Sequence, residues 1–510
     1  MVKPNQRHHS WMNLPFKTIE LRGGCLLCCL LIGFFTACQN KERKPNIIYI
    51  YADDLGYGEL GVYGQEKIKT PHLDQLAQEG IRFTHHYTSA PVCAPARCML
   101  MTGRHSGHSF IRGNYELGGF ADDQEGGQMP LPENALTVAK VLQQAGYKTG
   151  IIGKWGLGVT GTSGHPNRQG FDYFYGYLDQ KQAHNYYPTH LWENEQWDTL
   201  QNPNIIVHRK IEGDLTDEVF DYYKGQDYAI DKMRKKTKAF IERHKDEPFF
   251  LYLPSTIPHV SLQVPDGELE PYLGKFEEQP YGSEKGYTAA KYPLSTYAAM
   301  ISYLDKQVGE VVAYIKELGL EENTVIMFSS DNGPTFNGGV DREYFNSTGG
   351  LRGGKGEVYE GGIRVPFIAR WPGKITSGQV SDVVSVQYDM MATLCDIAGV
   401  EAPPNDGISL WPALSGQGKV TPRDYLYFEF PERGGQVAIR FQKYKGVKTG
   451  LKNNPNSTWQ LYDLESDTKE EYDIAAQHPD ILQKMDSIVK SEHWSATIRE
   501  WEIIDPKFNL

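Results

Sequence analysis

The sequence predicts an α/β fold with a large mixed, mostly parallel sheet and a smaller antiparallel sheet near its C-terminal end. Three observations support this class. Four short and almost continuously apolar runs, typical of strands buried on both faces, alternate with amphipathic helical patterns. Each run ends at polar side chains that can bind a ligand. After residue 381 the pattern changes to short strands that follow one another directly, as in antiparallel hairpins.

Residues 1–37 have the pattern of a lipoprotein signal peptide. Residues 25–37 are mostly apolar and follow Lys17 and Arg22, and this run is too short to span a membrane. The segment that ends at Cys38 resembles a bacterial lipobox. We therefore expect lipid on Cys38, a tether over residues 38–45, and anchoring in the periplasm or outer membrane. A cleaved ordinary signal peptide is the alternative, and the long segment before the apolar run leaves translation from Met12 open.

The catalytic domain is predicted over residues 46–385. Buried strands are expected at residues 46–51, 148–153, 249–253 and 324–328, and helices at residues 73–83, 135–147 and 296–318. Because parallel α/β sheets bind ligands outside the carboxyl ends of their strands, the polar residues after these strands should share one site. Two long insertions rich in Gly, Pro and Tyr, at residues 161–203 and 265–291, are expected to be functional or mobile.

Residues 386–510 are predicted to form a smaller α+β subdomain with an antiparallel sheet. The expected elements are a helix at residues 390–397, strands at 425–430, 437–448 and 460–464, and a last helix at 479–491. The sequence contains no internal repeat that would indicate a solenoid or a propeller.

Composition argues against nucleic-acid binding and against a disulfide framework. The formal net charge of −12 gives no general attraction for nucleic acid, so an anionic substrate requires a local basic site. Four of the seven cysteines lie at or before Cys38, and the three that remain are Cys93, Cys98 and Cys395. Because exported proteins rarely need a free thiol, we expect Cys93 to be modified.

The block from Cys93 to Arg104 places a thiol at a predicted helix start. Pro95 suits the first helical turn, and Arg97 follows one turn later. Cys93 would then face free N–H groups of the helix, a setting that attracts sulfate or phosphate. The block reads C-A-P-A-R-x-x-L-x-T-G-R. It resembles the signature of the formylglycine-dependent sulfatases, in which this cysteine is oxidised to an aldehyde whose hydrate is the nucleophile.

Oxygen ligands for a metal follow two of the predicted strands. Asp53 and Asp54 end one strand, and Asp331 and Asn332 end another. Oxygen-only sites select calcium or magnesium over zinc, although Asp and Asn are also common turn formers at strand ends. Together with Cys93 these residues are similar to the metal motifs of the family. The resemblance implies a calcium ion whose ligand shell is completed by the modified Cys93.

Four basic residues lie in blocks that resemble those of the family: Arg97, Lys154, His259 and Lys355. A sulfate ester needs positive charge on its non-bridging oxygens and a proton for its departing alkoxide. The resemblance assigns these residues to sulfate binding and to stabilisation of the nucleophile and the leaving oxygen. It covers about residues 44–475, and it implies an alkaline-phosphatase-like sandwich, hydrolysis of sulfate esters and a maturation enzyme that acts on Cys93.

The chain departs from the family pattern at Gly156. Many relatives carry a histidine there, which is assigned as the base that collapses the sulfated hydrate. His184, in the insertion that follows, is the predicted replacement. Contact with a substrate hydroxyl and a purely structural role are the alternatives for His184. His165 lies in a Gly- and Pro-rich turn and is interpreted as structural.

The substrate side is less specified by the sequence. His105, His108 and Arg112 follow the nucleophile block and are expected to line the substrate site. Six aromatic residues offer flat faces for a sugar ring, or else fill a core or brace a loop: Tyr173, Tyr177, Tyr186, Tyr187, Trp192 and Trp197. The expected substrate is a sulfated glycan sugar of galactose or N-acetylgalactosamine type, or a small sulfate ester. A phosphoester or phosphonate hydrolase and a non-catalytic glycan-binding lipoprotein remain as alternatives.

Overall fold

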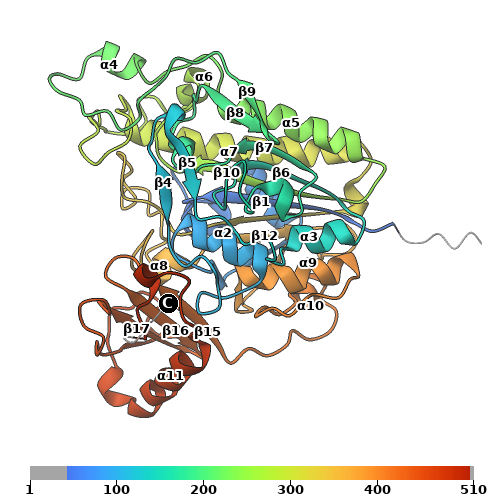
Figure 1. The fold of residues 1–510 in the computed structure, drawn as a ribbon, viewed down its shortest axis with the longest axis vertical. Coiled ribbons are helices and arrows are strands. Elements are labelled where there is room, and N and C mark those ends of the chain that lie inside the picture. The colour runs from blue at the N-terminus through green and yellow to red at the C-terminus, as the bar shows by residue number, and fades with distance from the viewer. Residues whose placement is uncertain (1–42, 506–510) are drawn as a thin grey trace, which may run out of the picture. The chain divides into compact units, whose positions relative to one another are not determined.

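The computed structural model describes residues 43–505. Its largest element is a ten-stranded mixed sheet, whose central strands are parallel neighbours (Figure 1). The central strands, in spatial order, are β11 (Thr324–Ser330), β1 (Asn46–Asp53), β10 (Phe249–Pro258), β6 (Lys148–Lys154) and β7 (Tyr173–Tyr177). On the β11 side lie β12 (Phe367–Arg370), β2 (Ile81–Phe83) and β13 (Gln379–Ser381), and on the β7 side β8 (His190–Glu193) and β9 (Gln196–Thr199). The predicted sheet is confirmed.

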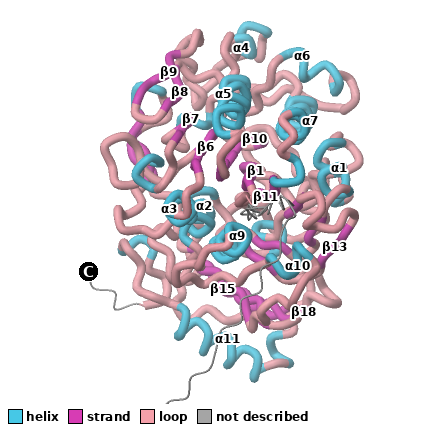
Figure 2. Tube along the Cα trace, turned by 90° about the vertical axis from the view of Figure 1, so that its right-hand side faces the viewer, coloured by secondary structure: helices cyan, strands magenta, loops and turns pink. Residues whose placement is uncertain are grey.

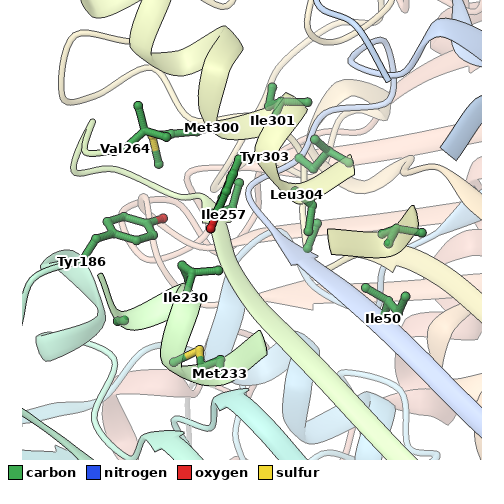
Figure 3. Close-up of a cluster of buried hydrophobic side chains, with 14 of the residues drawn as sticks. Ile50, Tyr186, Ile230, Met233, Ile257, Val264, Met300, Ile301, Tyr303 and Leu304 are labelled. Carbon is green, nitrogen blue, oxygen red and sulfur yellow. The ribbon is translucent and has the colours of Figure 1, made fainter. Parts of the chain in front are cut away.

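Alternate residues of β1 enter two different hydrophobic cores. Ile48 and Ile50 belong to one core, and Ile47 and Tyr49 to the other. The first core is covered by α1 (Pro71–Gln78), α5 (Ala229–His244) and α7 (Pro293–Glu317), and the second by α2 (Cys93–Thr102), α3 (Val138–Gln144) and α9 (Met390–Ala398). Figure 1 shows α5 and α7 on one face of the sheet and α2, α3 and α9 on the other, and Figure 2 also labels α1. In Figure 3, residues of α5 and α7 pack around Ile50 and Ile257.

The four strands that the sequence marked as buried are immediate neighbours in the sheet, in the order β11, β1, β10, β6. All three pairings between them are parallel, so their carboxyl ends lie along one edge. The expectation that their terminal polar residues share one site is therefore confirmed at the level of the backbone.

Two predicted elements differ from the structure. The helix expected over residues 73–83 ends at Gln78, and Ile81–Phe83 form β2 instead. The reason is tertiary: a Cβ atom on Gly80 would lie 2.1 Å from the carbonyl oxygen of Ala369, so only glycine lets the chain approach β12 here. The insertion at residues 161–203 is also more regular than expected, because it supplies β7, β8 and β9 to the sheet.

A separate four-stranded antiparallel sheet lies near the C-terminal end of the chain. It contains β15 (Tyr425–Phe430), β16 (Gln436–Phe441), β17 (Tyr444–Thr449) and β18 (Gln460–Asp463), and α11 (Pro479–Glu492) packs on it. The single strand expected over residues 437–448 is thus two strands joined at Gln442, whose φ is +53°. Helix α9 packs in the core of the large sheet, so the separate sheet begins later than the expected boundary at residue 386.

The remaining elements are short. They are α4 (Asp217–Asp221), α6 (Asp266–Leu269), α8 (Glu360–Ile363) and α10 (Trp411–Ser415), together with the strand pairs β3 (His86–Tyr87) with β14 (Ser385–Val386) and β4 (Glu116–Gly118) with β5 (Glu125–Gln128). Within residues 43–505, every helix is too short or too polar to cross a membrane. The predicted export signal and Cys38 lie outside the described residues.

Candidate active site

Three carboxylates lie together at the carboxyl edge of the central strands. Asp53 is the last residue of β1, Asp54 follows it, and Asp331 follows β11; all three are fully buried. Asp54 has a φ of +65°, a left-handed conformation that Asp tolerates better than most residues. Its backbone N–H donates to Oδ1 of Asp331 at 3.0 Å, and Nδ2 of Asn332 donates to Oδ1 of Asp54 at 2.7 Å. All four predicted metal ligands from the strand ends are therefore brought together.

Three buried or nearly buried cations pair with these carboxylates. The ion pairs are Lys154 Nζ with Asp53 Oδ2 at 2.7 Å, Arg97 Nη2 with Asp331 Oδ2 at 2.8 Å, and Lys355 Nζ with Asp54 Oδ1 at 2.8 Å. Lys154 ends β6, Arg97 lies on α2, and Lys355 precedes α8. Residues far apart in the sequence thus converge on one charged cluster, as the sequence motifs predicted.

Cys93 is the first residue of α2, as predicted, and its side chain is buried. The sulfur and carboxylate oxygens of Asp53 and Asp331 all lie within 4.8 Å of one another. Burial raises the pKa of Cys93 to about 11. The unmodified thiol is therefore protonated at neutral pH and is a weak nucleophile.

The oxygen atoms of this cluster suit a hard cation. Burial and the neighbouring Asp53 raise the pKa of Asp331 to about 7. Burial opposes the ionisation of Asp53, but Lys154 and His259 hold its pKa well below the usual range. Oδ1 of Asp53 and Oδ1 of Asn332 are buried, and no donor within residues 43–505 reaches them. These two unpartnered oxygens and the carboxylates of Asp54 and Asp331 are ligands of the kind that calcium prefers, so the residues present fit the implied metal.

The structure explains why residue 156 is glycine. Its φ is +79°, and a Cβ atom there would lie 2.6 Å from Cγ of Gln180. A histidine does not fit unless Gln180 moves. Both polar atoms of the Gln180 amide are buried and have no partner among the described residues. No sequence motif marked Gln180, which the fold places against the glycine.

His184 lies beside one of the predicted catalytic residues. Its buried ring stacks on His259, with ring centroids 5.0 Å apart and an interplanar angle of 14°. Nδ1 of His184 lies 3.1 Å from Nε2 of His208. His259 itself contacts the carboxylates, with Nε2 3.7 Å from Oδ2 of Asp54. His208 was not predicted, because it lies in a segment without a recognisable motif.

His105 and Arg112 do not join the charged cluster. Nη1 of Arg112 donates to Oε1 of Glu429 on β15 at 2.7 Å, and Nε2 of His105 lies 3.0 Å from Oε2 of Glu492 on α11. Both side chains are buried. Their polar groups fasten the C-terminal sheet and helix, and the expectation that they bind substrate stays a prediction. His108 likewise contacts a carboxylate, Asp406, at 3.0 Å.

Most of the predicted aromatic platform braces the fold. The hydroxyl of Tyr177 donates to the carbonyl of Asn185, and that of Tyr186 donates to the carbonyls of Thr256 and His259. Tyr187 is buried, whereas Tyr173 and Trp192 are partly buried and hydrogen-bonded to glutamates. Trp197, on the edge strand β9, is 58% exposed. The side chain of His165, which the sequence analysis interprets as structural, accepts a hydrogen bond from the N–H of Asn167.

Comparisons with known proteins identify the family of this chain. The sulfatase family profile matches residues 45–400, and the profile for the C-terminal region of N-sulphoglucosamine sulphohydrolase matches residues 354–495. The chain is 30% identical over 535 residues to N-acetylgalactosamine-6-O-sulfatase of Bacteroides thetaiotaomicron, which covers 90% of this chain and 97% of that protein. It is 32% identical over 494 residues to arylsulfatase A of Homo sapiens, with 90% and 89% covered.

Solved structures give the same result. The structure of Ps i-CgsB in complex with k-i-k-neocarrahexaose superposes with a TM-score of 0.72 and 27% identity, and the match covers 91% of this chain and 94% of that one. Profile, relatives and fold agree over nearly the whole described chain, and so this protein belongs to the sulfatase family and is a sulfuric ester hydrolase.

Proposed function

We propose that this sulfatase removes sulfate from a sulfated glycan sugar of galactose or N-acetylgalactosamine type. The observation that carries the proposal is the cluster of three carboxylates and three cations, in which Cys93 lies beside Asp53 and Asp331. A glycan substrate is supported by the relative named N-acetylgalactosamine-6-O-sulfatase and by the neighbour solved in complex with k-i-k-neocarrahexaose.

Asp53, Asp54, Asp331 and Asn332 would hold calcium, together with the modified Cys93. Calcium in this place supplies positive charge against the non-bridging oxygens of a sulfate ester. Arg97 and Lys154 hold the carboxylates in position through their ion pairs, and Lys355 adds a third cation on the side of Asp54. These fixed charges stabilise the negative charge that develops during transfer of the sulfuryl group.

We further propose that Cys93 is converted to formylglycine by a sulfatase-maturation enzyme. When hydrated, formylglycine supplies the oxygen nucleophile for attack on sulfur. The position of Cys93 at the start of α2, in contact with the carboxylate cluster, supports this role. A protonated and buried thiol would not serve as the nucleophile at neutral pH.

His259 is the proposed donor of the proton to the departing sugar oxygen. Its Nδ1–H donates to the carbonyl of Val260, which leaves Nε2 on the side of Asp54. Burial and Lys355 lower the pKa of His259 to about 4, so the protonated ring is a strong acid toward an alkoxide. A bound sulfate ester raises this pKa through its negative charge, and it thereby favours protonation when substrate is present.

The test combines mass spectrometry with a substrate panel. The peptide that contains Cys93 should show the loss of sulfur and the gain of oxygen, and one or more position-defined sulfated monosaccharides should release inorganic sulfate. An active enzyme with an unmodified thiol would contradict the proposed nucleophile. Faster hydrolysis of matched phosphate esters would assign a phosphoester hydrolase, and glycan binding without turnover by native protein would assign a binding lipoprotein.

Export and lipid anchoring at Cys38 are proposed from the sequence pattern alone. Metabolic labelling with a fatty acid in a bacterial host should mark the protein, and Cys38→Ser should abolish the label. Labelling that persists in the variant would contradict the lipobox.

A further inference from the structure

Three aromatic rings from separate segments surround His184. Phe120 comes from the turn between β4 and β5, His208 from the segment after β9, and Tyr287 from the second insertion. Their ring centroids lie 5.5, 5.3 and 5.1 Å from that of His184. The ring of His184 also stacks on the ring of His259. The ring of His184 is therefore held between the charged cluster and residues that the sulfatase motifs do not include.

One backbone N–H sets the direction of the hydrogen bonds here. The N–H of Tyr287 donates to Nδ1 of His208 at 3.3 Å, so this nitrogen must carry a lone pair. A neutral imidazole with an unprotonated Nδ1 carries its proton on Nε2. Nε2 of His208 lies 3.1 Å from Nδ1 of His184. His208 therefore donates this hydrogen bond, and His184 accepts it.

The second ring in this chain is fixed in turn. Burial lowers the pKa of His208, and burial together with His259 holds the pKa of His184 well below its usual value, so both rings are neutral. Since Nδ1 of His184 accepts, its proton lies on Nε2. Within residues 43–505, the side-chain hydrogen bonding of His184 involves Nδ1, which contacts His208. Nε2 of His184 is thus an N–H donor and has no lone pair to accept a proton.

The two stacked rings have opposite proton arrangements. His259 donates from Nδ1 to the carbonyl of Val260 and keeps a lone pair on Nε2. His184 accepts at Nδ1 and keeps a proton on Nε2. A fixed N–H donor suits hydrogen bonding to an oxygen of the substrate. A base that replaces the histidine missing at position 156 would need the opposite tautomer, with a lone pair on Nε2.

We propose that His208 is a positioning residue that holds His184 as a hydrogen-bond donor to a sugar oxygen next to the sulfate ester. This inference rests on the proposed function, and it assigns His184 to substrate recognition rather than to proton abstraction. The backbone of Tyr287 supports it. Tyr287 has a φ of +69°, which is rare for a bulky residue, and such strain persists where the surroundings fix it. Here it aligns the N–H that sets the tautomer.

The kinetic test compares His208→Leu, which removes the donor, with His208→Gln, whose amide still donates. The probes are the best sulfated monosaccharide of the panel and 4-nitrophenyl sulfate, which has no sugar oxygen. For His208→Leu the ratio of kcat/KM for the sugar to kcat/KM for the aryl ester should fall about 10- to 100-fold, as for loss of an orienting partner. His208→Gln should retain most of the parental ratio. An unchanged ratio in His208→Leu would overturn the inference.

The spectroscopic test reads the tautomer directly. The protein is labelled with ¹⁵N-histidine, and the NMR signal that is missing from the His184→Gln variant is assigned to His184. This signal should show a protonated Nε2 and an unprotonated Nδ1. His208→Glu offers an acceptor, so it should move the proton of His184 to Nδ1. A proton on Nδ1 in the parental protein would overturn the inference. This readout also decides the matter if His208→Leu does not fold.

Failure of the inference and failure of the proposed function are distinguishable. If no sulfate ester is hydrolysed, the proposed function fails, while the tautomer of His184 still tests the hydrogen-bond chain. If the parental protein is active and His184→Ala gives one equivalent of alcohol and then stalls, His184 is the base and the inference is wrong. If His184→Ala instead loses activity mainly on the sugar, the recognition role is supported.

Discussion

Asp331 links α2 to the carboxylate cluster, because it accepts hydrogen bonds from both Arg97 and the backbone N–H of Asp54. Asp331→Ala removes a proposed metal ligand and leaves Arg97 without this partner. We expect kcat on 4-nitrophenyl sulfate to fall by about 10²- to 10³-fold or more, as for loss of a main electrostatic stabiliser. Asp341→Ala, at an exposed aspartate, is the control. A kcat near the parental value would exclude Asp331 from the site.

Gly156 and Gln180 form a pair that a double-mutant experiment can test. Gly156→Ala should lower Tm, because the left-handed backbone alone costs about 1–2 kcal/mol for a residue with a Cβ atom. Contact with Cγ of Gln180 adds to that cost. In a Gln180→Ala background the contact is gone, so the same substitution should lower Tm by less. Equal losses in the two backgrounds would show that Gln180 does not restrict the site.

At the scale of elements, Arg112 ties the segment after α2 to strand β15. Its ion pair with Glu429 is buried, and removal of one partner from such a pair costs about 3–5 kcal/mol. We expect Arg112→Ala to destabilise the fold by an amount of this order in urea unfolding. Arg104→Ala, which breaks a partly exposed pair with Asp406, should cost about 1 kcal/mol or less.

The same variants distinguish a role of Arg112 in fastening the C-terminal sheet from a role in substrate binding. If Arg112 only fastens β15, the folded fraction of Arg112→Ala keeps the parental KM for a sulfated sugar. A raised KM with parental stability would support the original expectation for this residue. Arg112 lies against the C-terminal sheet because Gly103, with a φ of +66°, ends α2, and the segment that follows runs to that sheet.

At the scale of the whole molecule, the proposed metal should stabilise the fold. A ligand that binds only the folded state adds about 2.7 kcal/mol at a concentration of 100 times its Kd. Exhaustive chelation should therefore lower both Tm and turnover, and added calcium should restore them. In Asp331→Ala the shift in Tm should be much smaller. Full activity and unchanged Tm after complete removal of bound metal would contradict a calcium site.

Stability should also depend on pH through His493, which joins the end of α11 to β15. Its Nδ1 lies 3.0 Å from Oε2 of Glu429, and its Nε2 lies 3.1 Å from Oε1 of Glu502. Burial opposes the charge, but the two glutamates raise the pKa of His493 to about 9. The folded pKa thus exceeds the unfolded value of about 6.5. The stabilisation is complete below about pH 6.5 and is lost as the pH rises to about 9.

Urea unfolding across about pH 6 to 9 checks this sign. The free energy of unfolding of the parental protein should fall over this range, and His493→Gln should flatten the curve. A slope that the substitution leaves intact would assign the pH dependence to other groups.

Local sequence patterns were enough to predict which polar residues lie at the ends of the central strands. Strand periodicity placed Asp53, Lys154, His259 and Asp331 at carboxyl ends, and parallel α/β topology then brought them to one edge. The start of a helix at Cys93 could also be predicted, because it depends on neighbouring residues in the sequence. These features are encoded in short stretches, so a single sequence was enough to predict them.

Contacts between residues that are far apart in the sequence could not be predicted and had to be found in the folded chain. Nothing in the sequence around Gly80 indicates that the strand that begins at residue 367 packs against it. This contact is the reason that the helix ends early. His208 and Tyr287 carry no motif, yet their contact fixes the proton on His184. A hydrogen-bond direction depends on three segments packed together, and no local pattern of side chains encodes that contact. For this reason, the sequence leaves the role of His184 open, and the proposed role rests on the packing of its neighbours.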